Sequence, residues 1–399
     1  MDTEFAGDRL TSARLRMARE SAELSLTDLS RRVPYSRSTL HAYESGRRTP
    51  TAEAIAWIER VCGPLVDVVT AAAILGRNDV DRRSFLRGAA YSTALSASAA
   101  MTPEGTYRLI SVDDSRRVGA AEVTAVRQVT QALHVLDEVR GGGAGRTAAA
   151  EFLSTDVAAI LRARFADARV RSTAFSAASE LAYLCGFKAH DAGADGLAQR
   201  YYISALRLAE ESGEPGQDGW ALRALSTQGS DIGEPSAAPD LAEAALSRAR
   251  GKISRAALGM FAVTASRTHA ESGNHAAARA TLPDPDATDD EYPVWMRAWT
   301  PGPTVVDQTA KTFEALGDPA EAERNRTRAL TLWNRETHPR VHALTAIEAG
   351  LLRWQLGEFQ AAADMVRPAL PMLTAIDSDR TRRALARIHT TAPELAIAG

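Results

Sequence analysis

The feature that most constrains the fold is a set of five glycines that recur at nearly constant spacing in the second half of the chain. They are separated by 40, 40, 44 and 40 residues, at Gly193, Gly233, Gly273, Gly317 and Gly357. A small residue stands seven positions before each, and an alanine five positions after each. Small residues at fixed points around a turn allow antiparallel helices to pack closely, and a fixed period indicates stacked repeats. The spacing therefore predicts a solenoid of helical hairpins.

Other segments extend this prediction to residues 111–392. Residues 118–143 and 146–165 have the pattern of another helix pair, and no convincing run of alternating residues predicts strands. The stretches YYISALRLAEESG and LGEFQAAADMVRPAL are similar to tetratricopeptide repeats, although the period exceeds the usual length of about 34 residues. We therefore expect an all-α chain with a tetratricopeptide-like (TPR-like) body.

A small basic module precedes this body. Residues 8–63 contain ten arginines and seven acidic residues, a net charge of +3, whereas the whole chain has a net charge of −3. Capping and turn residues divide the module into four short helices: Ser25 with Asp28, Ser36, Gly46, and Thr49-Pro50-Thr51. A basic module joined to an acidic body is typical of a nucleic-acid reader with a separate sensing or assembly domain.

The motifs of this module carry a family resemblance. ARLRMARES in the first helix, LHAYESGRRTP after the second motif helix and the apolar positions between them resemble the helix-turn-helix of Cro/C1 (Xre-like) repressors. The resemblance implies that the recognition helix presents Ser36, Arg37, Ser38, Thr39 and His41 to base edges in the major groove, and that Arg16, Arg47 and Arg48 contact phosphates. It also implies a structural pair between Arg19 and Glu44.

Two residues depart from the family pattern. Pro34 occupies the turn position usually given to glycine, and its ring forbids a positive φ, so we expect another turn geometry. Leu26 replaces the polar residue common at the start of the second helix, which removes a contact to DNA.

Residues 64–110 are interpreted as a linker with an unusual segment, DRRSFLRGAAYSTALSASAA, at residues 81–100. It resembles a twin-arginine export signal, but such signals act at the N-terminus, and here a DNA-reading module precedes it. The sixteen uncharged residues from Gly88 to Pro103 are fewer than the roughly 20 apolar residues that span a bilayer. We interpret the segment as an interdomain helix; an internal start that yields an exported product is the alternative.

The longest repeat interval contains the strongest candidates for an effector site. Trp295 and Trp299 are four residues apart and are expected on one helix face, where, with Arg297 or Trp333, they would line a pocket. The alternative, which the pattern favours, is that these large residues fill the space made by a four-residue insertion.

Other chemistry lacks support in the sequence. His338 and His342 have the spacing of a helical metal site, but no third ligand is evident, and we expect neither metal nor cofactor. Phosphate-binding loops, nucleophile elbows and paired-carboxylate motifs were not found, so no enzyme activity is predicted. The two cysteines, Cys62 and Cys185, offer no disulfide framework and fit a cytoplasmic setting.

Taken together, the chain resembles actinobacterial Xre-type transcriptional regulators with TPR-like C-terminal domains. The resemblance implies a cytoplasmic, dimeric protein that binds a palindromic operator in double-stranded DNA and takes a small-molecule, peptide or protein effector on its body. Two alternatives remain open: an interaction scaffold whose helix-turn-helix docks on protein, and a repeat-domain phosphatase or hydrolase that acts on a signalling partner.

Overall fold

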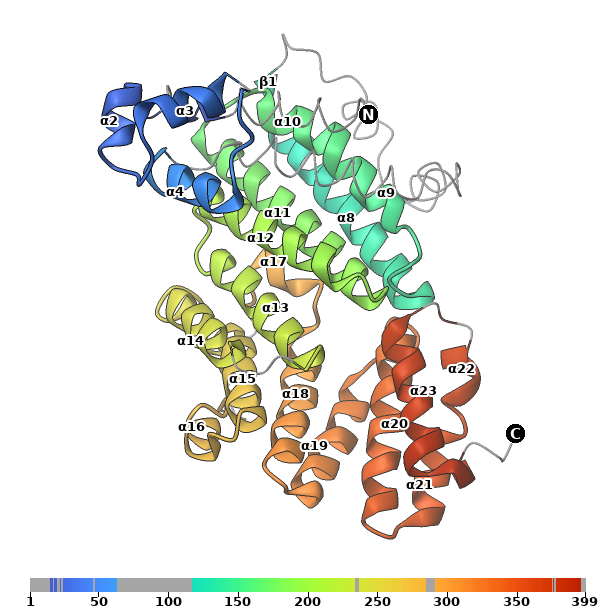
Figure 1. Ribbon diagram of the computed structural model, residues 1–399. Coiled ribbons are helices and arrows are strands. Elements are labelled where there is room, and N and C mark those ends of the chain that lie inside the picture. The colour runs from blue at the N-terminus through green and yellow to red at the C-terminus, as the bar shows by residue number, and fades with distance from the viewer. Residues whose placement is uncertain are drawn as a thin grey trace. The chain divides into compact units, whose positions relative to one another are not determined.

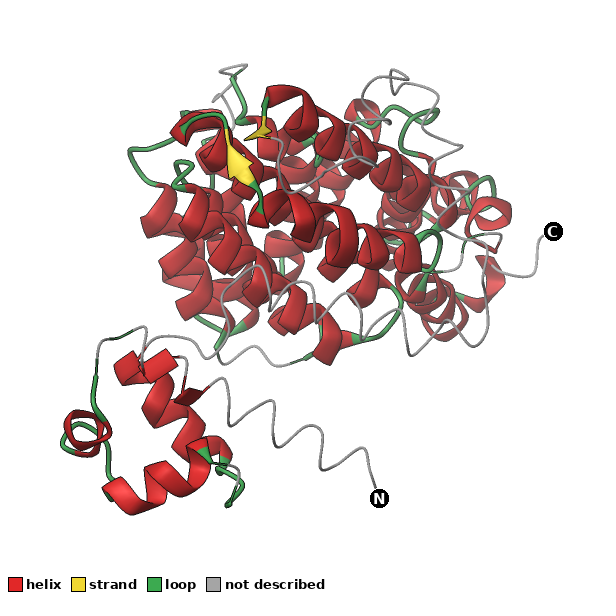
Figure 2. Cartoon of the chain, turned by 90° about the horizontal axis from the view of Figure 1, so that it is seen from above, coloured by secondary structure: helices red, strands yellow, loops and turns green. Residues whose placement is uncertain are grey.

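The computed structural model describes residues 15–62, except 17, 20, 21, 23 and 46, and residues 117–395, except 234–236, 285–290, 375 and 377. Contacts divide the chain into an N-terminal unit, Met1–Ala71, and a body, Ala72–Gly399. Helices dominate both units, which confirms the predicted all-α class (Figure 2). Two short parallel strands, β1 (Arg117–Val118) and β2 (Arg164–Phe165), are an addition that the sequence did not predict. The twin-arginine-like segment lies outside the described residues.

The N-terminal unit is built from short helices around a small apolar core. Its helices are a first one that includes Leu15 and Arg19, then α2 (Leu26–Ser30), α3 (Arg37–Glu44) and α4 (Ala52–Cys62) (Figure 1). The core contains Leu15, Leu29, Val33, Leu40, Tyr43, Ala54 and Ile58. The apolar spacing of α2 and α3 therefore turns one side of each short helix inward and leaves the other in solvent.

Side-chain caps fix where these helices begin. Ser25 and Asp28 form the predicted capping box, and the hydrogen bonds from the Ser25 side chain and backbone lower the pKa of Asp28. Ser36 caps α3, where its Oγ accepts a hydrogen bond from the backbone N–H of Thr39 at 3.2 Å. Gly46, predicted to end α3, lies outside the described residues.

The predicted Arg19–Glu44 pair is confirmed. Arg19 Nε and Nη2 donate to the two carboxylate oxygens of Glu44 at 2.7 and 2.8 Å, and Arg19 Nη1 donates to the carbonyl oxygen of Leu24 at 2.9 Å. This bidentate pair joins the first helix to the end of α3.

The turn around Pro34 contains no residue with positive φ. In the described part of the chain, Thr300 is the one non-glycine residue with positive φ. The turn therefore uses another geometry, as expected from proline.

From residue 117 on, where the structure describes it, the body is a succession of helices. They are α8 (Ala120–Arg140), α9 (Arg146–Phe152), the π-helical turn η1 (Leu153–Val157), α10 (Ala158–Arg162), α11 (Ala168–Asp191), α12 (Asp195–Ser212), α13 (Gln217–Asp231), α14 (Ala238–Ala249), α15 (Arg255–Glu271), α16 (His275–Ala280), α17 (Val294–Arg297), α18 (Pro301–Ala315), α19 (Pro319–Leu332), α20 (Pro339–Gln355), α21 (Phe359–Val366), α22 (Leu370–Thr374), α23 (Asp379–Thr391) and the 3₁₀ turn η2 (Pro393–Leu395). None of the helices in the described ranges is long and apolar enough to cross a membrane.

The recurring glycines lie in the turns of five helical hairpins. All five have positive φ, from 74° to 83°, a conformation that glycine adopts without the steric cost of a Cβ. The hairpins are α11 with α12, α13 with α14, α15 with α16, α18 with α19, and α20 with α21, and they follow one another through the body (Figure 1). The glycine spacing therefore predicted the hairpin arrangement correctly, while the likeness to tetratricopeptide repeats stays a resemblance.

The small residues around each turn mark where the paired helices cross. Ser226 and Ser266 each donate from Oγ, at 2.7 Å, to the carbonyl oxygen of the alanine twelve residues later. At the equivalent place in the last hairpin, a Cβ added to Gly350 would lie 3.1 Å from the carbonyl oxygen of Ala362 and 2.4 Å from a Val366 methyl. Larger side chains would push the helices apart.

A buried ionic cluster joins α8, the first helix of the body that the structure describes, to the last hairpin. Arg340 on α20 donates to the carboxylates of Asp137 on α8 and Asp191 on α11, the latter at 3.0 Å. Lys188 donates to Asp137 at 3.3 Å, and Ser378, the cap of α23, donates to Asp191 at 2.8 Å. Arg340, Asp137 and Lys188 are fully buried. The cluster therefore holds α8, α11 and α20 together around one interior.

Candidate functional site

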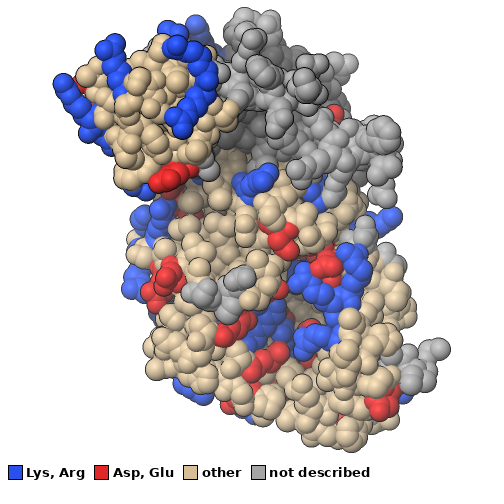
Figure 3. All heavy atoms as spheres, in the orientation of Figure 1, with Lys and Arg blue, Asp and Glu red and all other residues tan. Residues whose placement is uncertain are grey.

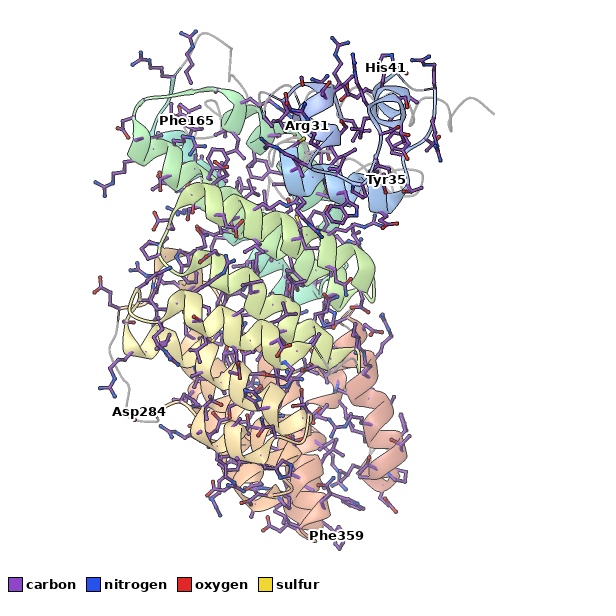
Figure 4. All side chains as sticks on the ribbon, turned by 60° about the vertical axis from the view of Figure 1, so that its left-hand side comes forward. Arg31, Tyr35, His41, Phe165, Asp284 and Phe359 are labelled. Atoms are coloured by element: carbon purple, nitrogen blue, oxygen red, sulfur yellow. The ribbon has the colours of Figure 1, made fainter. Side chains whose placement is uncertain are left out.

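The exposed side of α3 carries the residues predicted to reach bases. Ser36, Arg37, Ser38 and His41 are exposed, and Thr39 is half-buried. Leu40 and Tyr43 of the same helix are buried and pack the helix against the core of the unit. Figure 4 shows His41 on this helix and Arg31 just after α2.

Hydroxyl groups form a small network at the start of α3. The Oγ of Ser36 lies 2.8 Å from that of Ser38 and 2.9 Å from the Oγ1 of Thr39. Ser36 therefore has a structural role as the cap in addition to its predicted contact to DNA. The hydrogen bonds to Ser36 hold the Ser38 and Thr39 hydroxyls in a defined arrangement at the N-terminal end of α3, the predicted recognition helix.

Arginines border this surface. Arg16, Arg47 and Arg48, predicted to contact phosphates, are all exposed. Arg47 donates from Nε to Ser45 Oγ at 3.0 Å, and the Arg48 guanidinium lies 5.8 Å from the centre of the Tyr43 ring. Arg31, which is not among the residues predicted from the sequence, is also exposed, and its Nη1 lies 3.6 Å from Oδ1 of Asp28. The arginine side chains of this unit stand out in blue in Figure 3.

The body contains a cavity of about 140 Å³, partly open to the surface, between helices that are far apart in the sequence. Its wall includes residues of α8, α11, α12, α13, α15, α18, α20 and α23 and of the loops that contain Trp299 and Trp333. A second hollow, of about 220 Å³, shares His190, Asp231, Asp307, Lys311 and Arg380 with the first. In Figure 3 basic and acidic side chains gather where the body is hollowed.

The four predicted effector residues have different locations. Trp299 and Trp333 line the cavity. Trp295 is buried against Trp220, with ring centres 5.7 Å apart, and is not part of the lining. Arg297 is exposed, also outside the lining, and donates from Nε to the carbonyl oxygen of Tyr292 at 2.8 Å.

The expectation that Trp295 and Trp299 share a helix face is wrong. The helix α17 ends at Arg297, and Thr300 has a positive φ of 46°. The cause is Pro301, which begins α18 and disfavours helical geometry in the residue before it. Because the helix ends before Trp299, this side chain lies in the cavity. Its ring centre is 4.8 Å from that of Tyr183 and 5.0 Å from that of Phe187.

Charged side chains lie beside these aromatic rings. The lining contains the bases Arg223, Arg267, Lys311 and Arg380 and the acids Glu138, Asp231 and Asp307. Burial, with Arg267 nearby, lowers the pKa of Lys311 to about 8. Burial alone would raise the pKa of Asp231, but Arg267 and His190 outweigh it and hold that pKa well below its usual range. None of these charged residues was predicted for the site from the sequence.

His338 and His342, the two histidines with the spacing of a metal site, are not arranged as metal ligands in the described structure. His338 lines the cavity, and its ring nitrogens lie 3.1 Å from the Thr300 hydroxyl and 2.8 Å from the Thr337 hydroxyl. Burial lowers the pKa of both His338 and His342. Within the described residues, no group of three potential ligands is placed to hold a metal ion.

Comparison with known proteins bears on the N-terminal unit. No curated protein matches the chain. Residues 12–85 match a family model described as a helix-turn-helix domain, a range that contains α2, α3 and α4 and continues into the segment beyond residue 62. The match and the exposed side of α3 support, at a general level, a DNA-binding regulator.

Proposed function

We propose that this protein is a sequence-specific transcriptional regulator of the Xre type that reads a palindromic operator as a dimer. The observation that carries the proposal is the exposed, capped start of α3, where Arg37, Ser38 and His41 face solvent while Leu40 anchors the helix. A helix presented in this way fits the major groove, and a two-fold dimer matches a palindrome. The protein would act in the cytoplasm, where its DNA is.

The body contributes dimerisation and effector binding in this proposal. An effector changes operator affinity if it binds more tightly to one arrangement of the two DNA-binding units than to another. The cavity behind Trp299 supports an effector role because it combines an aromatic wall with charged side chains. Sedimentation of the purified protein at several concentrations tests the dimer, and a monomer at operator-binding concentrations would contradict it.

The operator is sought first by selection of genomic fragments with the purified full-length protein. The best site is then titrated with wild type, Arg37→Ala and the control Arg335→Ala, which removes an exposed arginine of the body. We expect Arg37→Ala to weaken specific binding by about 1–3 kcal/mol and Arg335→Ala to leave it unchanged. Enrichment of no sequence, with equal binding by all three proteins, would reject the proposal.

The salt dependence separates DNA reading from protein docking. Replacing Arg47 or Arg48 with alanine should reduce the slope of log affinity against log salt by about one for each lost phosphate contact. A scaffold that uses the same surface for a protein partner would show no such slope with DNA. Turnover of phosphorylated or peptide substrates by the purified protein would instead favour the repeat-domain phosphatase or hydrolase.

A further inference from the structure

Aromatic residues form one continuous side of the body cavity. Tyr183 stacks on Trp220 with ring centres 5.5 Å apart and planes inclined by 18°. Trp299 meets Tyr183, Phe187 and His134 edge to face, at 4.6 to 5.0 Å. All five residues line the cavity. A cavity of about 140 Å³ is close to the roughly 150 Å³ of an engineered apolar cavity that holds benzene.

The acids of the lining already have arginine partners. Asp231 accepts from Arg267 at 2.6 Å, and Asp307 accepts from Arg326 on α19. Glu138 lies 3.7 Å from Arg340. These three carboxylates are therefore matched by guanidinium groups before any ligand is considered.

Three cations of the lining lack such a match. Among the described residues, Arg223, Lys311 and Arg380 form no direct salt bridge, although the charges of Asp231 and Asp307 act on Lys311 and those of Glu138 and Asp307 act on Arg380. Arg223 is buried, donates from Nε to the carbonyl oxygen of Met260 at 3.0 Å and lies over the Trp220 ring at 4.6 Å. Burial lowers its pKa. The lining consequently has four Lys and Arg side chains for three carboxylates, a balance that favours an anionic ligand.

Polar atoms in the same wall are also unsatisfied. His134 Nε2, Glu138 Oε2, Trp220 Nε1, Gln228 Oε1 and Trp333 Nε1 are buried without a hydrogen-bond partner in the described structure. Most buried polar groups in proteins have a partner, and a cluster of exceptions in one wall indicates a site that a bound molecule completes.

Lys311 and Arg380 stand where the two hollows meet, since both residues line both of them. A molecule with its ring against Trp299 and Tyr183 would direct a substituent toward these cations. We propose that the body cavity binds a small organic anion with an aromatic ring, the ring held by the aromatic wall and the acid group by Lys311 and Arg380. This inference deepens the effector part of the proposed function and rests on it for its regulatory meaning.

Calorimetric titration of the full-length protein without DNA tests the site. The probes are benzoate and phenylphosphate, with benzamide as the neutral ring and inorganic phosphate as the anion without a ring. We expect both ring-bearing anions to bind more tightly than benzamide and inorganic phosphate. Equal affinity for benzoate and benzamide, or no binding of either ring-bearing anion at millimolar concentration, would overturn the proposal. If inorganic phosphate binds as tightly as phenylphosphate, the ring requirement is wrong.

Substitutions then locate the binding site. Lys311→Met should weaken benzoate binding by about tenfold, while Lys311→Arg, which keeps the charge, should retain most of it. Lys252→Met is the matched control, because Lys252 is exposed and lies outside both hollows. Equal loss in Lys252→Met and Lys311→Met would contradict the assignment. Thermal unfolding of each variant verifies that its body is folded.

The two proposals can fail separately. Anion binding is measured without DNA, and the Arg37→Ala test is made without an anion. If benzoate binds but does not change operator affinity, the cavity is an anion site without a role in regulation. Loss of operator recognition in Arg37→Ala with no anion binding would leave a DNA-reading protein and overturn the cavity assignment.

Discussion

The N-terminal unit and the body present their candidate sites in opposite ways. In the unit, all predicted contacts except Arg16 lie within twelve positions of one another, on an outer surface whose form follows from caps and one small core. In the body, Glu138 and Arg380 line the same cavity although 242 positions separate them in the sequence. A surface on one helix can be recognised as a motif, whereas an interior cavity exists only after every hairpin has packed.

The largest effect that would test this contrast is expected from Arg340→Met. Removing one partner of a buried ionic cluster leaves Asp137 and Asp191 without their guanidinium, which should lower the free energy of unfolding of the body by about 3–5 kcal/mol. Urea unfolding measures the effect. The N-terminal unit should keep its stability, and Arg335→Met, an exposed control, should change neither unit. A body as stable as wild type would show that the cluster does not hold the cavity together.

A smaller effect is expected on the pH dependence of the cavity. Because the pKa of Lys311 is lowered to about 8, its ammonium group loses a proton as the pH rises through that value. Benzoate binding favours the protonated form and should weaken about tenfold between about pH 7 and 9.

The neighbours of Lys311 determine how this pH experiment is read. Arginines stay charged over the range, and Arg267 and His190 keep Asp231 ionised. His190 contacts Asp195 and Asp231, and these contacts outweigh burial and raise its pKa. Lys311→Met, which keeps His190, should therefore lose most of the dependence. An equally steep curve in that variant would assign the titration to His190.

The smallest effect is expected from removing one helix cap in each unit, at Ser36 and at Ser254. Ser36 caps α3 in the N-terminal unit and Ser254 caps α15 in the body, each accepting from a backbone N–H at 3.2 Å. Replacement by alanine should cost each unit about 1 kcal/mol of stability. Only Ser36→Ala should also weaken operator binding, as measured by titration of the selected site. The same loss in Ser254→Ala would mean that the two units are coupled.

Local patterns predicted a large part of the fold. The capping box at Ser25, the pair of Arg19 with Glu44 and the turns at Gly193 and its four equivalents all depend on residues a fixed distance apart in the sequence or on a known motif. These features reflect backbone geometry and close helix crossings, which a sequence pattern expresses directly.

The cavity was only partly predictable for a physical reason. The unusual density of aromatic residues pointed to Trp299 and Trp333, but helical spacing also pointed to Trp295 and Arg297, since nothing local revealed how far Pro301 would reverse the chain. Lys311 and Arg380 gave no signal, because a lysine or arginine on a helix is ordinarily a solvated side chain. They matter because the nearby acids, Asp231 and Asp307, form salt bridges with Arg267 and Arg326 instead. Which acid pairs with which arginine is decided only when the body packs.

The contact between Arg340 and Asp137 has a consequence for how the body opens. Repeat arrays whose neighbours touch only in sequence order lose their terminal repeats first, so their end amides exchange with solvent far faster than central ones. Here residues 203 positions apart share a buried ion pair, which ties α8 to the last hairpin. Hydrogen exchange should therefore be nearly as slow in α8 and α20 as in α13, and the body should open as one cooperative unit.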